Sequence, residues 1–218
     1  NTLGLLNILD TVKKTNKKIK VFNAVSGQFY GNRKNNIYNE KSYIAPQSPY
    51  GVSKASSFWL TKIFREWYGI KCCSGILFNH ESPLRSNEFV TKKIINCSKL
   101  IKKGKLKHLY LGNINVYRDW GWAPEYVEAM YLMLRQKHPK DLVIGSGKRH
   151  SLRSFVYEVF RLLNIPRSSL KINVKKLMRK RDIRTYKADP KLAKKILKWK
   201  AKTSFKQIIY KMVNEQLY

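Results

Sequence analysis

Two apolar runs separated by a helical segment constrain the fold more than any other feature of this sequence. Residues 18–26 and 70–78 are short and apolar enough to be buried strands, and residues 49–68 between them have the length and polar face of a helix. A strand, a helix and a second strand in this order form the unit from which parallel sheets are built. Strand-like and helical stretches continue to alternate further along the chain. We therefore expect an α/β fold with a doubly wound, Rossmann-like parallel sheet.

The rest of the chain follows the same alternation. Further strands are expected at residues 108–111, 142–144 and 170–174. Further helices are expected at residues 88–103, 123–136, 152–163, 190–197 and 205–216. The first fourteen residues read as an amphipathic helix, and its apolar face is expected to consist of Leu3, Leu6, Leu9 and Val12. Residues 31–48 are polar and read as a loop.

Tyr50 and Lys54 stand four residues apart in the sequence S-P-Y-G-V-S-K, where Ser48 and Pro49 predict the start of a helix. A helix places residues i and i+4 on one face. An ammonium beside a phenol lowers the pKa of the phenol, so that the tyrosine can take a proton from an alcohol. Ser26 ends the preceding strand and can hydrogen-bond the same alcohol. A solvated helix face gives the same spacing, so the pair alone leaves both interpretations open.

The composition is strongly basic, with 45 Lys and Arg residues against 13 Asp and Glu residues and a formal net charge of +32. Such a charge suits a nucleic-acid-binding protein. The lysines, however, are spread over almost every helical segment together with many Ile, Asn and Tyr residues, which is the bias that an AT-rich genome produces. No nucleic-acid-binding motif accompanies them. We therefore expect nonspecific adhesion to polyanions and no specific nucleic-acid partner.

Other classes of protein are disfavoured by simple counts. No run of eighteen apolar residues exists, so we expect no membrane span. Cys72, Cys73 and Cys97 are odd in number and have no C-x-x-C spacing, which predicts free, buried thiols in a cytoplasmic protein. The four histidines are scattered, so we expect no metal site.

Two longer stretches carry a family resemblance. Residues 75–94 read G-I-L-F-N-H-E-S-P-L-R-S-N-E-F-V-T-K-K-I, and residues 109–127 read L-Y-L-G-N-I-N-V-Y-R-D-W-G-W-A-P-E-Y-V. Together with S-P-Y-G-V-S-K they resemble the GDP-mannose 4,6-dehydratases of the extended short-chain dehydrogenase/reductase superfamily, over nearly the whole chain. The resemblance implies conversion of GDP-mannose to GDP-4-keto-6-deoxymannose, with internal hydride transfer through NADP, in a homodimer or homotetramer. It also implies that residues 1–80, approximately, are the remaining Rossmann part, and that residues 81–218 interleave the sheet with a smaller substrate-binding lobe.

The glycine-rich turn of this superfamily is not found in the sequence. That turn seats the cofactor pyrophosphate on a helix N-terminus, but the eleven glycines here never take the spacing G-x-G-x-x-G. Gly145-Ser146-Gly147 follows a short apolar strand, lacks the third glycine and reads as a plain turn. Against the family, about one hundred residues, roughly one mononucleotide-binding half, are missing before Asn1. We therefore expect a fragment, or the product of a truncated gene, that is inactive by itself.

The resemblance also assigns roles to single residues. The family motif S-T-S-E-x-Y-G matches V-S-G-Q-F-Y-G here, and the implied catalytic residues are Ser26, Gln28, Tyr50 and Lys54. The implied cofactor-binding residues are Tyr50, Lys54, His80 and Arg85. The implied substrate-binding residues are Asn79, Val90, Lys93, Arg118, Arg179 and Asp182. The alternatives are a strand-end histidine without cofactor contact at position 80, and a structural pair of Arg118 with Asp119.

Gln28 stands where the family has a glutamate that takes the C5 proton of the sugar. A carboxamide cannot accept that proton, and loss of a positioned general base costs about 10²–10⁴-fold in rate. Glu81 is present in the family alongside the catalytic glutamate, so we do not expect it to substitute. Two hypotheses follow. The chain is a GDP-mannose 4,6-dehydratase that needs the missing part, or it is a degenerate homologue that at most binds a nucleotide sugar or a partner subunit.

Overall fold

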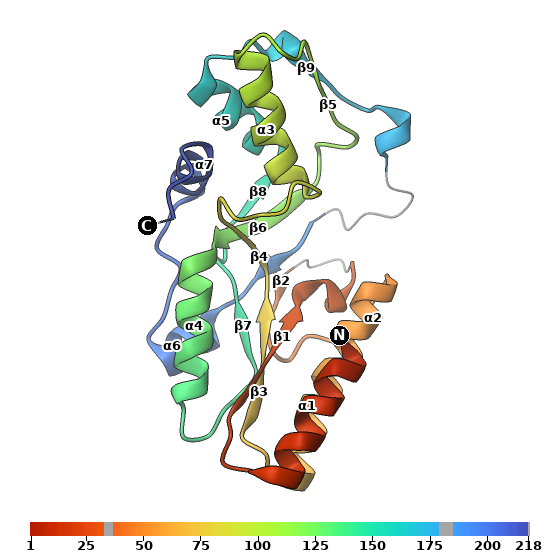
Figure 1. The fold of residues 1–218 in the computed structure, drawn as a ribbon, viewed down its shortest axis with the longest axis vertical. Helices are drawn as coiled ribbons and strands as arrows, with labels where there is room; N and C mark the ends of the chain where they lie inside the picture. Colours follow the sequence, from red (N-terminus) through yellow and green to blue (C-terminus); the bar gives the residue numbers. More distant parts are fainter. Residues whose placement is uncertain (33–36, 179–184, 218) are drawn as a thin grey trace.

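The computed structural model describes residues 1–32, 37–178 and 185–217, which form two lobes (Figure 1). The lower lobe is built on a three-stranded parallel sheet of order β1-β3-β7. Its strands are β1 (Val21–Ser26), β3 (Cys72–Leu77) and β7 (Leu142–Ile144). All six residues of β3 are buried, as expected of a central parallel strand with both faces covered. The predicted α/β class with parallel strands is confirmed.

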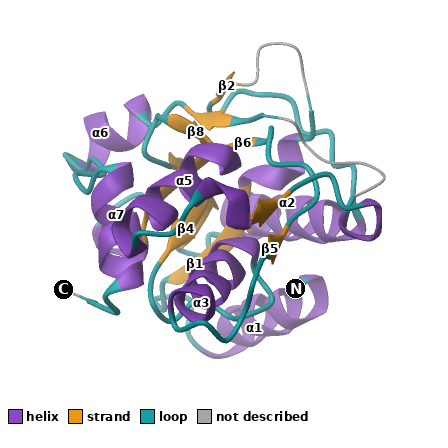
Figure 2. Ribbon diagram, turned by 90° about the horizontal axis from the view of Figure 1, so that it is seen from above, coloured by secondary structure: helices purple, strands orange, loops and turns teal. Residues whose placement is uncertain are grey.

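Helices cover both faces of this sheet. The helices are α1 (Thr2–Thr15), α2 (Pro49–Tyr68), α4 (Ala123–Arg135) and α6 (Lys191–Leu197). α1 packs against α2, which lies on one face of β1 and β3, and α4 lies on the other face (Figure 1). Seen from above, α1 and α2 lie on the side opposite α6 (Figure 2). Residues 136–141 connect α4 to β7, so a segment far along the chain joins the sheet of β1 and β3.

The upper lobe packs helices around a second sheet of order β4-β6-β8, in which β4 and β6 are parallel and β8 is antiparallel. Its elements are β4 (Asn79–Glu81), β6 (Tyr117–Trp122), β8 (Arg149–Ser151), α3 (Val90–Lys102), α5 (Leu152–Leu163) and α7 (Phe205–Val213). Two small parallel pairs complete the strands, namely β2 (Ile37–Tyr38) with β10 (Lys187–Ala188), and β5 (Leu109–Tyr110) with β9 (Leu170–Lys171). Three 3₁₀ turns are η1 (Gly27–Tyr30), η2 (Arg167–Ser169) and η3 (Lys175–Leu177).

The long helix α2 has the bounds that its capping residues predict. The Ser48 hydroxyl accepts a hydrogen bond from the Gly51 N–H at 3.0 Å, and Pro49 takes the first helical position, where its missing N–H costs nothing. Gly69 ends the helix in the left-handed conformation at φ 68°. These caps fix where the first turn of α2, which carries Tyr50, meets the end of β1.

The face of α1 that contacts the core differs from the prediction. Leu5, Leu9 and Val12 are buried, Leu6 packs partly against them, and Leu3 is 73% exposed. Residues three apart shift by about 60° around a helix at each step. Residues chosen three apart therefore reach the opposite side of the helix within three steps. Residues spaced alternately four and three apart stay on one face.

The remaining differences from the sequence prediction concern short elements. β4, β6, β8 and the pair β2–β10 were not predicted, because strands of two or three residues, and strands that mix arginine, aspartate and tryptophan, give no clear alternation. β9 ends at Lys171 rather than at residue 174, and α7 ends at Val213 rather than at residue 216. The three cysteines are free, as predicted; Cys72 and Cys73 are also buried as predicted, whereas Cys97 is only half-buried. Within the described ranges, no helix is both long and apolar enough to cross a membrane.

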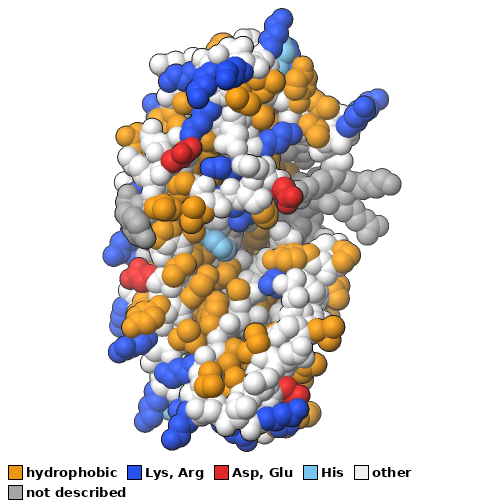
Figure 3. Space-filling model, viewed as in Figure 1, with side chains coloured by type: hydrophobic (Ala, Val, Ile, Leu, Met, Phe, Trp, Pro, Cys, Tyr) orange, Lys and Arg blue, Asp and Glu red, His pale blue; other side chains and the backbone are white. Residues whose placement is uncertain are grey.

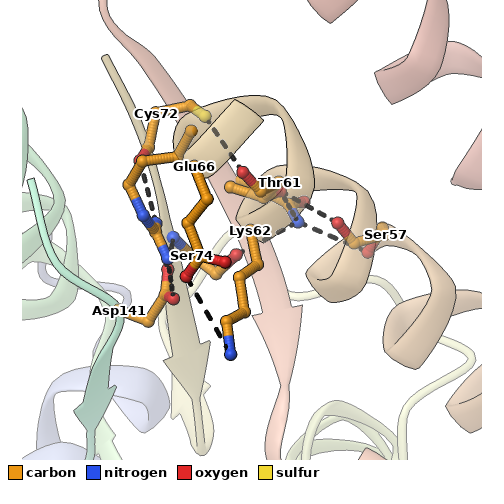
Figure 4. A network of polar contacts seen from close by, with 9 residues as sticks. Ser57, Thr61, Lys62, Glu66, Cys72, Ser74 and Asp141 are labelled. Atoms are coloured by element: carbon orange, nitrogen blue, oxygen red, sulfur yellow. Dashed lines mark hydrogen bonds and ion pairs between the residues drawn. The ribbon is translucent and has the colours of Figure 1, made fainter. Parts of the chain in front are cut away.

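A polar network fixes α2 against the sheet at the end away from its first turn (Figure 4). Arg65 donates through both terminal nitrogens to the Asp141 carboxylate, at 2.9 and 2.5 Å, and the Ser74 N–H donates to the same carboxylate at 2.6 Å. Nearer the middle of the helix, the buried amide of Asn23 donates to the Thr61 hydroxyl at 3.0 Å. Helix α2 is therefore tied to β1 through Asn23, and through Asp141 to β3 and to the loop that leads into β7.

Candidate active site

The predicted catalytic residues lie where β1 ends and α2 begins. Ser26 is the last residue of β1, and its hydroxyl accepts a hydrogen bond from the Gln28 N–H at 3.3 Å, which starts the turn η1. A Cβ atom on Gly51, in the first turn of α2, would lie 3.4 Å from the Gln28 carbonyl oxygen. A Cβ on Gly27 would lie 3.0 Å from the Phe78 ring. The glycines thus let η1 pass close to both α2 and the end of β3.

Tyr50 and Lys54 lie on one face of α2, as their spacing predicts. The Lys54 Nζ atom is 5.7 Å from the centre of the Tyr50 ring, and the Tyr50 side chain is 45% exposed. Burial lowers the pKa of Lys54. Its ammonium donates a hydrogen bond of 2.8 Å to the Ala24 carbonyl oxygen in β1. The helix therefore brings the lysine beside both the tyrosine and the strand that carries Ser26.

The carbonyl that Lys54 contacts lies on the outer edge of β1. Among the described residues, β1 pairs with β3 alone. The Val21 N–H donates to the Lys71 carbonyl at 3.0 Å, so the backbone groups of residues 21, 23 and 25 point toward β3. The groups of residues 22, 24 and 26 consequently point the other way. Lys54 thus supplies a donor to a strand-edge carbonyl, and Ala24 itself is exposed.

Asn79 and His80 lie on β4, directly after the end of β3. His80 Nδ1 is 2.9 Å from the Phe78 carbonyl oxygen, and its ring packs at 4.9 Å against the ring of Tyr126. Burial, helped by the charge of Arg85, lowers the pKa of His80, so the neutral ring is favoured at pH 7. The side-chain oxygen of Asn79 accepts a hydrogen bond from the Tyr186 hydroxyl. Both residues are half-buried between the lobes.

Arg85 contacts residues of its own lobe. Its Nε atom is 3.5 Å from a Glu81 carboxylate oxygen, and its guanidinium lies 3.7 Å from the centre of the Phe89 ring. Glu81 is almost fully buried and accepts a hydrogen bond of 2.9 Å from the Thr91 hydroxyl. Burial raises the pKa of Glu81 to about 7, although Arg85 and Thr91 act in the opposite direction. The Glu81 carboxylate thus connects β4 to the start of α3.

Arg118 and Asp119 point to opposite faces of β6, because successive residues of a strand alternate. The buried carboxylate of Asp119 accepts hydrogen bonds from the N–H groups of Ser146, Gly147 and Ala188, at 2.9, 2.9 and 3.1 Å. Asp119 thus binds these backbone N–H groups and not Arg118, the partner that the alternative interpretation of the sequence gave it. The Gly145-Ser146-Gly147 segment is a turn, as predicted, and its N–H groups bind the carboxylate of the same chain.

The Arg118 guanidinium lies 5.3 Å from the ring of Tyr186, the residue that also contacts Asn79. Val90 is the first residue of α3 and Lys93 lies one turn further along, both on the upper lobe. Arg179 and Asp182 lie outside the described residues, so their predicted roles stay predictions. The structure thus places Arg118 beside Asn79, while Val90 and Lys93 belong to a separate element above them (Figure 1).

A pocket of about 560 Å³ lies on another side of α2. Its walls are mostly aromatic and aliphatic side chains of η1, residues 40–46 and α2, among them Tyr30, Tyr43, Phe58 and Trp59. None of the predicted site residues that the structure describes lines this pocket.

Three residues near the site were missed by the sequence reasoning. Tyr126 and Tyr186 contact His80 and Asn79, and Asp119 holds the turn beside them. A single aspartate followed by two tryptophans in R-D-W-G-W is the signal that could have identified Asp119 as a buried acceptor. Tyr186 gave no such signal, because it follows a lysine-rich stretch far from β4 in the sequence.

The fold is shared with solved enzymes that bind nicotinamide cofactors. A Pseudomonas aeruginosa protein named RMD, solved with NADPH, matches 99% of this chain and 72% of its own, with a TM-score of 0.89 and 21% sequence identity. The dTDP-glucose 4,6-dehydratase of Bacillus anthracis, solved with NAD, matches 98% of this chain and 66% of its own, with a TM-score of 0.87 and 21% identity. Likeness at this identity establishes a common fold.

Sequence relatives define the family more narrowly. The family model described as GDP-mannose 4,6 dehydratase matches residues 1–212. The GDP-mannose 4,6 dehydratase of Dictyostelium discoideum is 38% identical over 99% of this chain and 66% of its own length. The human protein of that name is 35% identical over 97% of this chain and 62% of its own length. The chain belongs to the GDP-mannose 4,6-dehydratase family, and it spans about two thirds or less of the length of these relatives.

Proposed function

We propose that the chain carries the hydroxyl-activating and sugar-binding part of a GDP-mannose 4,6-dehydratase, on part of a doubly wound sheet. The observation that carries this proposal is the contact between η1 and the first turn of α2. That contact brings Ser26, Gln28 and Tyr50 to one end of β1, beside Lys54. Family membership supplies the substrate class, GDP-mannose, and the reaction class, elimination of water from the sugar.

Each of these side chains has a role that its surroundings support. The Tyr50 hydroxyl takes the proton of the sugar 4-hydroxyl, with the Lys54 ammonium 5.7 Å from the centre of its ring. The Ser26 hydroxyl donates a hydrogen bond to the same sugar oxygen. Gln28 occupies the position from which the C5 proton would be removed, and its carboxamide cannot take that proton. The dehydration step is therefore the one that this chain performs worst.

NADP is the proposed cofactor, and it would accept a hydride from the sugar and return it within one turnover. The nicotinamide end fits the chain, because Tyr50, Lys54 and a neutral His80 lie near the ends of β1 and β3. Arg85, proposed to contact the same cofactor, would have to exchange part of its contact with Glu81 and Phe89. The pyrophosphate end has no glycine-rich turn in this sequence. The cofactor is thus only partly held by the residues of this chain.

Asn79, Val90, Lys93, Arg118, Arg179 and Asp182 are proposed to bind GDP-mannose. Arg118 is the residue to test, because a guanidinium matches phosphate oxygens with two parallel hydrogen bonds. We expect GDP-mannose to raise the melting temperature of the chain more than UDP-glucose does. Arg118→Ala should remove most of that difference, whereas Arg135→Ala, on the outer surface of α4, should keep it. Equal shifts with both nucleotide sugars, or a full shift with Arg118→Ala, would contradict the proposed substrate class.

A second candidate function is binding without catalysis. Gln28 favours it, because the position of the general base carries an amide. The two candidates differ in a chimaera that keeps Gln28 and joins this chain to the third of the Dictyostelium relative that the chain does not cover. Formation of the 4-keto sugar by that protein, followed by NMR, supports the dehydratase. Saturable GDP-mannose binding without any product supports the non-catalytic homologue.

We also propose that the chain self-associates through α1 and α2, either as a homodimer or as a homotetramer built from such dimers. Leu3 and Ile8 on α1, and Val52 and Trp59 on α2, are 73%, 53%, 51% and 48% exposed. Val52 and Trp59 are seven residues apart, so they lie on one line along the helix. The side chain of Asn1 contacts Ser53, which places the start of α1 beside this line. Two helices with an apolar outer stripe suit self-association.

A further inference from the structure

Three loops meet at the end of the molecule opposite the candidate active site. They follow α1, α2 and α4, and they lead into β1, β3 and β7. Because the strands are parallel, the loops that enter them gather at one edge of the sheet. The ammonium of Lys20 donates to the Gln136 carbonyl at 3.4 Å, and the Val21 N–H donates to the Lys71 carbonyl at 3.0 Å. These hydrogen bonds join the three loops into one surface.

The three loops carry six exposed lysines, here called the basic end. They are Lys17, Lys18, Lys20, Lys71, Lys137 and Lys140. Asp141 is the one acidic residue of these loops, and it turns inward to Arg65 and the Ser74 N–H (Figure 4). Its charge is thus balanced by Arg65, and the lysines contribute +6 without compensation. The space-filling view shows Lys and Arg side chains gathered at this lower end (Figure 3).

Helix ends do not account for this charge. The C-terminal ends of α1, α2 and α4 point toward the basic end, and each carries about half a negative charge. Together they offset about −1.5 of the +6. Lys13 and Lys14 in the last turn of α1 and Arg135 in that of α4 already serve the ends of these two helices. The loop lysines are therefore in excess of what the helices need.

An exposed aromatic side chain also lies at the basic end. Trp67, near the C-terminal end of α2, is 75% exposed. Its neighbour Tyr68 packs toward α1, with the Lys13 ammonium 3.8 Å from its ring centre. The Trp67 indole consequently presents an apolar face to solvent beside the lysines. An exposed aromatic ring among basic side chains is the combination that binds single-stranded nucleic acids, because the ring stacks on a base while the lysines contact phosphates.

We propose that the basic end binds single-stranded nucleic acid, without sequence preference, through the six lysines and Trp67. The proposal is independent of the sugar-nucleotide function, since it uses the opposite end of the sheet. It agrees with the expectation of nonspecific adhesion to polyanions and gives that adhesion a location. A membrane surface fits less well, because insertion needs an apolar helix face at this end. An acidic peptide would engage the lysines but would leave the Trp67 ring without a stacking partner.

The test measures fluorescence anisotropy of fluorescein-labelled dT20 with the full chain at low salt. One variant replaces four lysines of the basic end, Lys17→Gln, Lys20→Gln, Lys71→Gln and Lys140→Gln. The matched control replaces four exposed lysines at the C-terminal end of α3 and in the segment that follows it, at the other end of the molecule, Lys102→Gln, Lys103→Gln, Lys105→Gln and Lys107→Gln. We expect the first variant to bind at least about 10-fold more weakly, and the log–log slope of affinity against salt to fall by about 0.7 for each phosphate that is no longer neutralised. The control should change less than about 3-fold.

Trp67 is tested separately. Trp67→Ala should weaken dT20 binding about 5-fold or more, and Trp67→Phe should keep most of the affinity, because base stacking needs a ring. Circular dichroism melting checks that every variant is folded. Equal weakening by both lysine variants would overturn the proposal, since the overall charge would then suffice. So would poly-glutamate binding as tight as dT20 with no effect of Trp67→Ala, or tighter binding of phosphatidylserine vesicles that depends on the same lysines.

Discussion

At the scale of single residues, Gln28 decides how far the chemistry can proceed. The residue lies in η1, its main chain lies against the first turn of α2, and its side chain is half-buried. Proton removal from the 4-hydroxyl needs Tyr50 and Lys54 but no carboxylate. Proton removal from C5 needs a base, and an amide at position 28 cannot serve. The side chain at position 28 therefore decides whether the second proton can be removed, and it leaves the first proton transfer unaffected.

We expect Gln28→Glu, in the chimaera with the missing third of a relative, to raise formation of the 4-keto-6-deoxy sugar about 10²-fold or more. The measurement is product formation from GDP-mannose, followed by NMR. Gln47→Glu, an exposed position just before α2, adds the same charge and should change the rate little. A chimaera with Gln28 that is already as fast as Gln28→Glu would place the base elsewhere.

Glu81 gives a pH dependence of stability that can be measured on the chain as it is. Burial raises its pKa from 4.5 in the unfolded chain to about 7 in the folded protein. The folded state therefore holds the proton more tightly, and stability falls as the pH rises between these values. Relative to Glu81→Gln, the free energy of unfolding of the wild type should fall by about 3 kcal/mol between pH 4 and pH 8.

Urea unfolding at several pH values measures this difference for Glu81→Gln. The exposed Glu128→Gln serves as the control and should follow the wild type at every pH. Parallel curves for the wild type and Glu81→Gln would show that the buried carboxyl keeps an ordinary pKa.

At the scale of elements, α2 depends on the network at its C-terminal half. Arg65 and Asp141 are 21% and 14% exposed, and the Asp141 carboxylate also accepts the Ser74 N–H. Arg65→Ala would leave that carboxylate mostly buried without its partner. We expect a loss of about 2–4 kcal/mol in the free energy of unfolding, measured by urea denaturation. Arg65→Lys should recover only part, because an ammonium lacks the two parallel donors.

The control for this network is Arg161→Ala on α5, whose side chain is 64% exposed in its pair with Glu158. Its effect should be clearly smaller than that of Arg65→Ala, because water screens an exposed guanidinium. Equal losses for Arg65→Ala and Arg161→Ala would show that the network adds no more than a surface ion pair.

The elements that the sequence predicted well share a physical basis. Helix α2 has a serine cap, a proline at its first position and a glycine after its end. Strand β3 is a mostly apolar run that follows shortly after that glycine, and all of its residues are buried. Local rules suffice for these elements. β4 and β6 pair with one another and with β8 across the upper lobe, so their strand character comes from partners distant in sequence. The Leu3 error arose from applying a spacing of three without the helical drift.

The candidate site likewise contains contacts that local sequence patterns predict and contacts that depend on residues distant in the sequence. Tyr50 and Lys54 lie on one face of α2, as a spacing of four predicts, and Ser26 ends β1, the strand whose Ala24 carbonyl Lys54 contacts. Tyr186 reaches Asn79 from 107 residues further along, so no local pattern reports it. The bond from Lys54 to the Ala24 carbonyl depends on which edge of β1 is uncovered, which a local pattern does not contain.

At the scale of the whole molecule, self-association through α1 and α2 competes with a net charge of +32. We expect a homodimer by light scattering after size exclusion, with a dimer fraction that rises with salt, because screening weakens the repulsion. The double variant Val52→Lys and Trp59→Lys should be monomeric at every salt concentration. The variant Leu100→Lys, on the exposed side of α3, should dimerise like the wild type. A wild-type monomer at high salt, or a dimeric double variant, would exclude this interface.

The outer edge of β1 has a consequence for the behaviour of the chain in solution. Its sequence V-F-N-A-V-S has neither a charged residue nor a proline, and residues 22, 24 and 26 leave backbone donors and acceptors unpaired by any described strand. Such an edge is a template for aggregation through added strands, and natural proteins often place a lysine there, because its charge opposes pairing with another strand. Lys54 supplies such a charge from a neighbouring helix, since its ammonium binds the Ala24 carbonyl. Neutralising this single ammonium should therefore make the chain precipitate sooner in concentrated, salty solution, where charge repulsion no longer keeps the molecules apart.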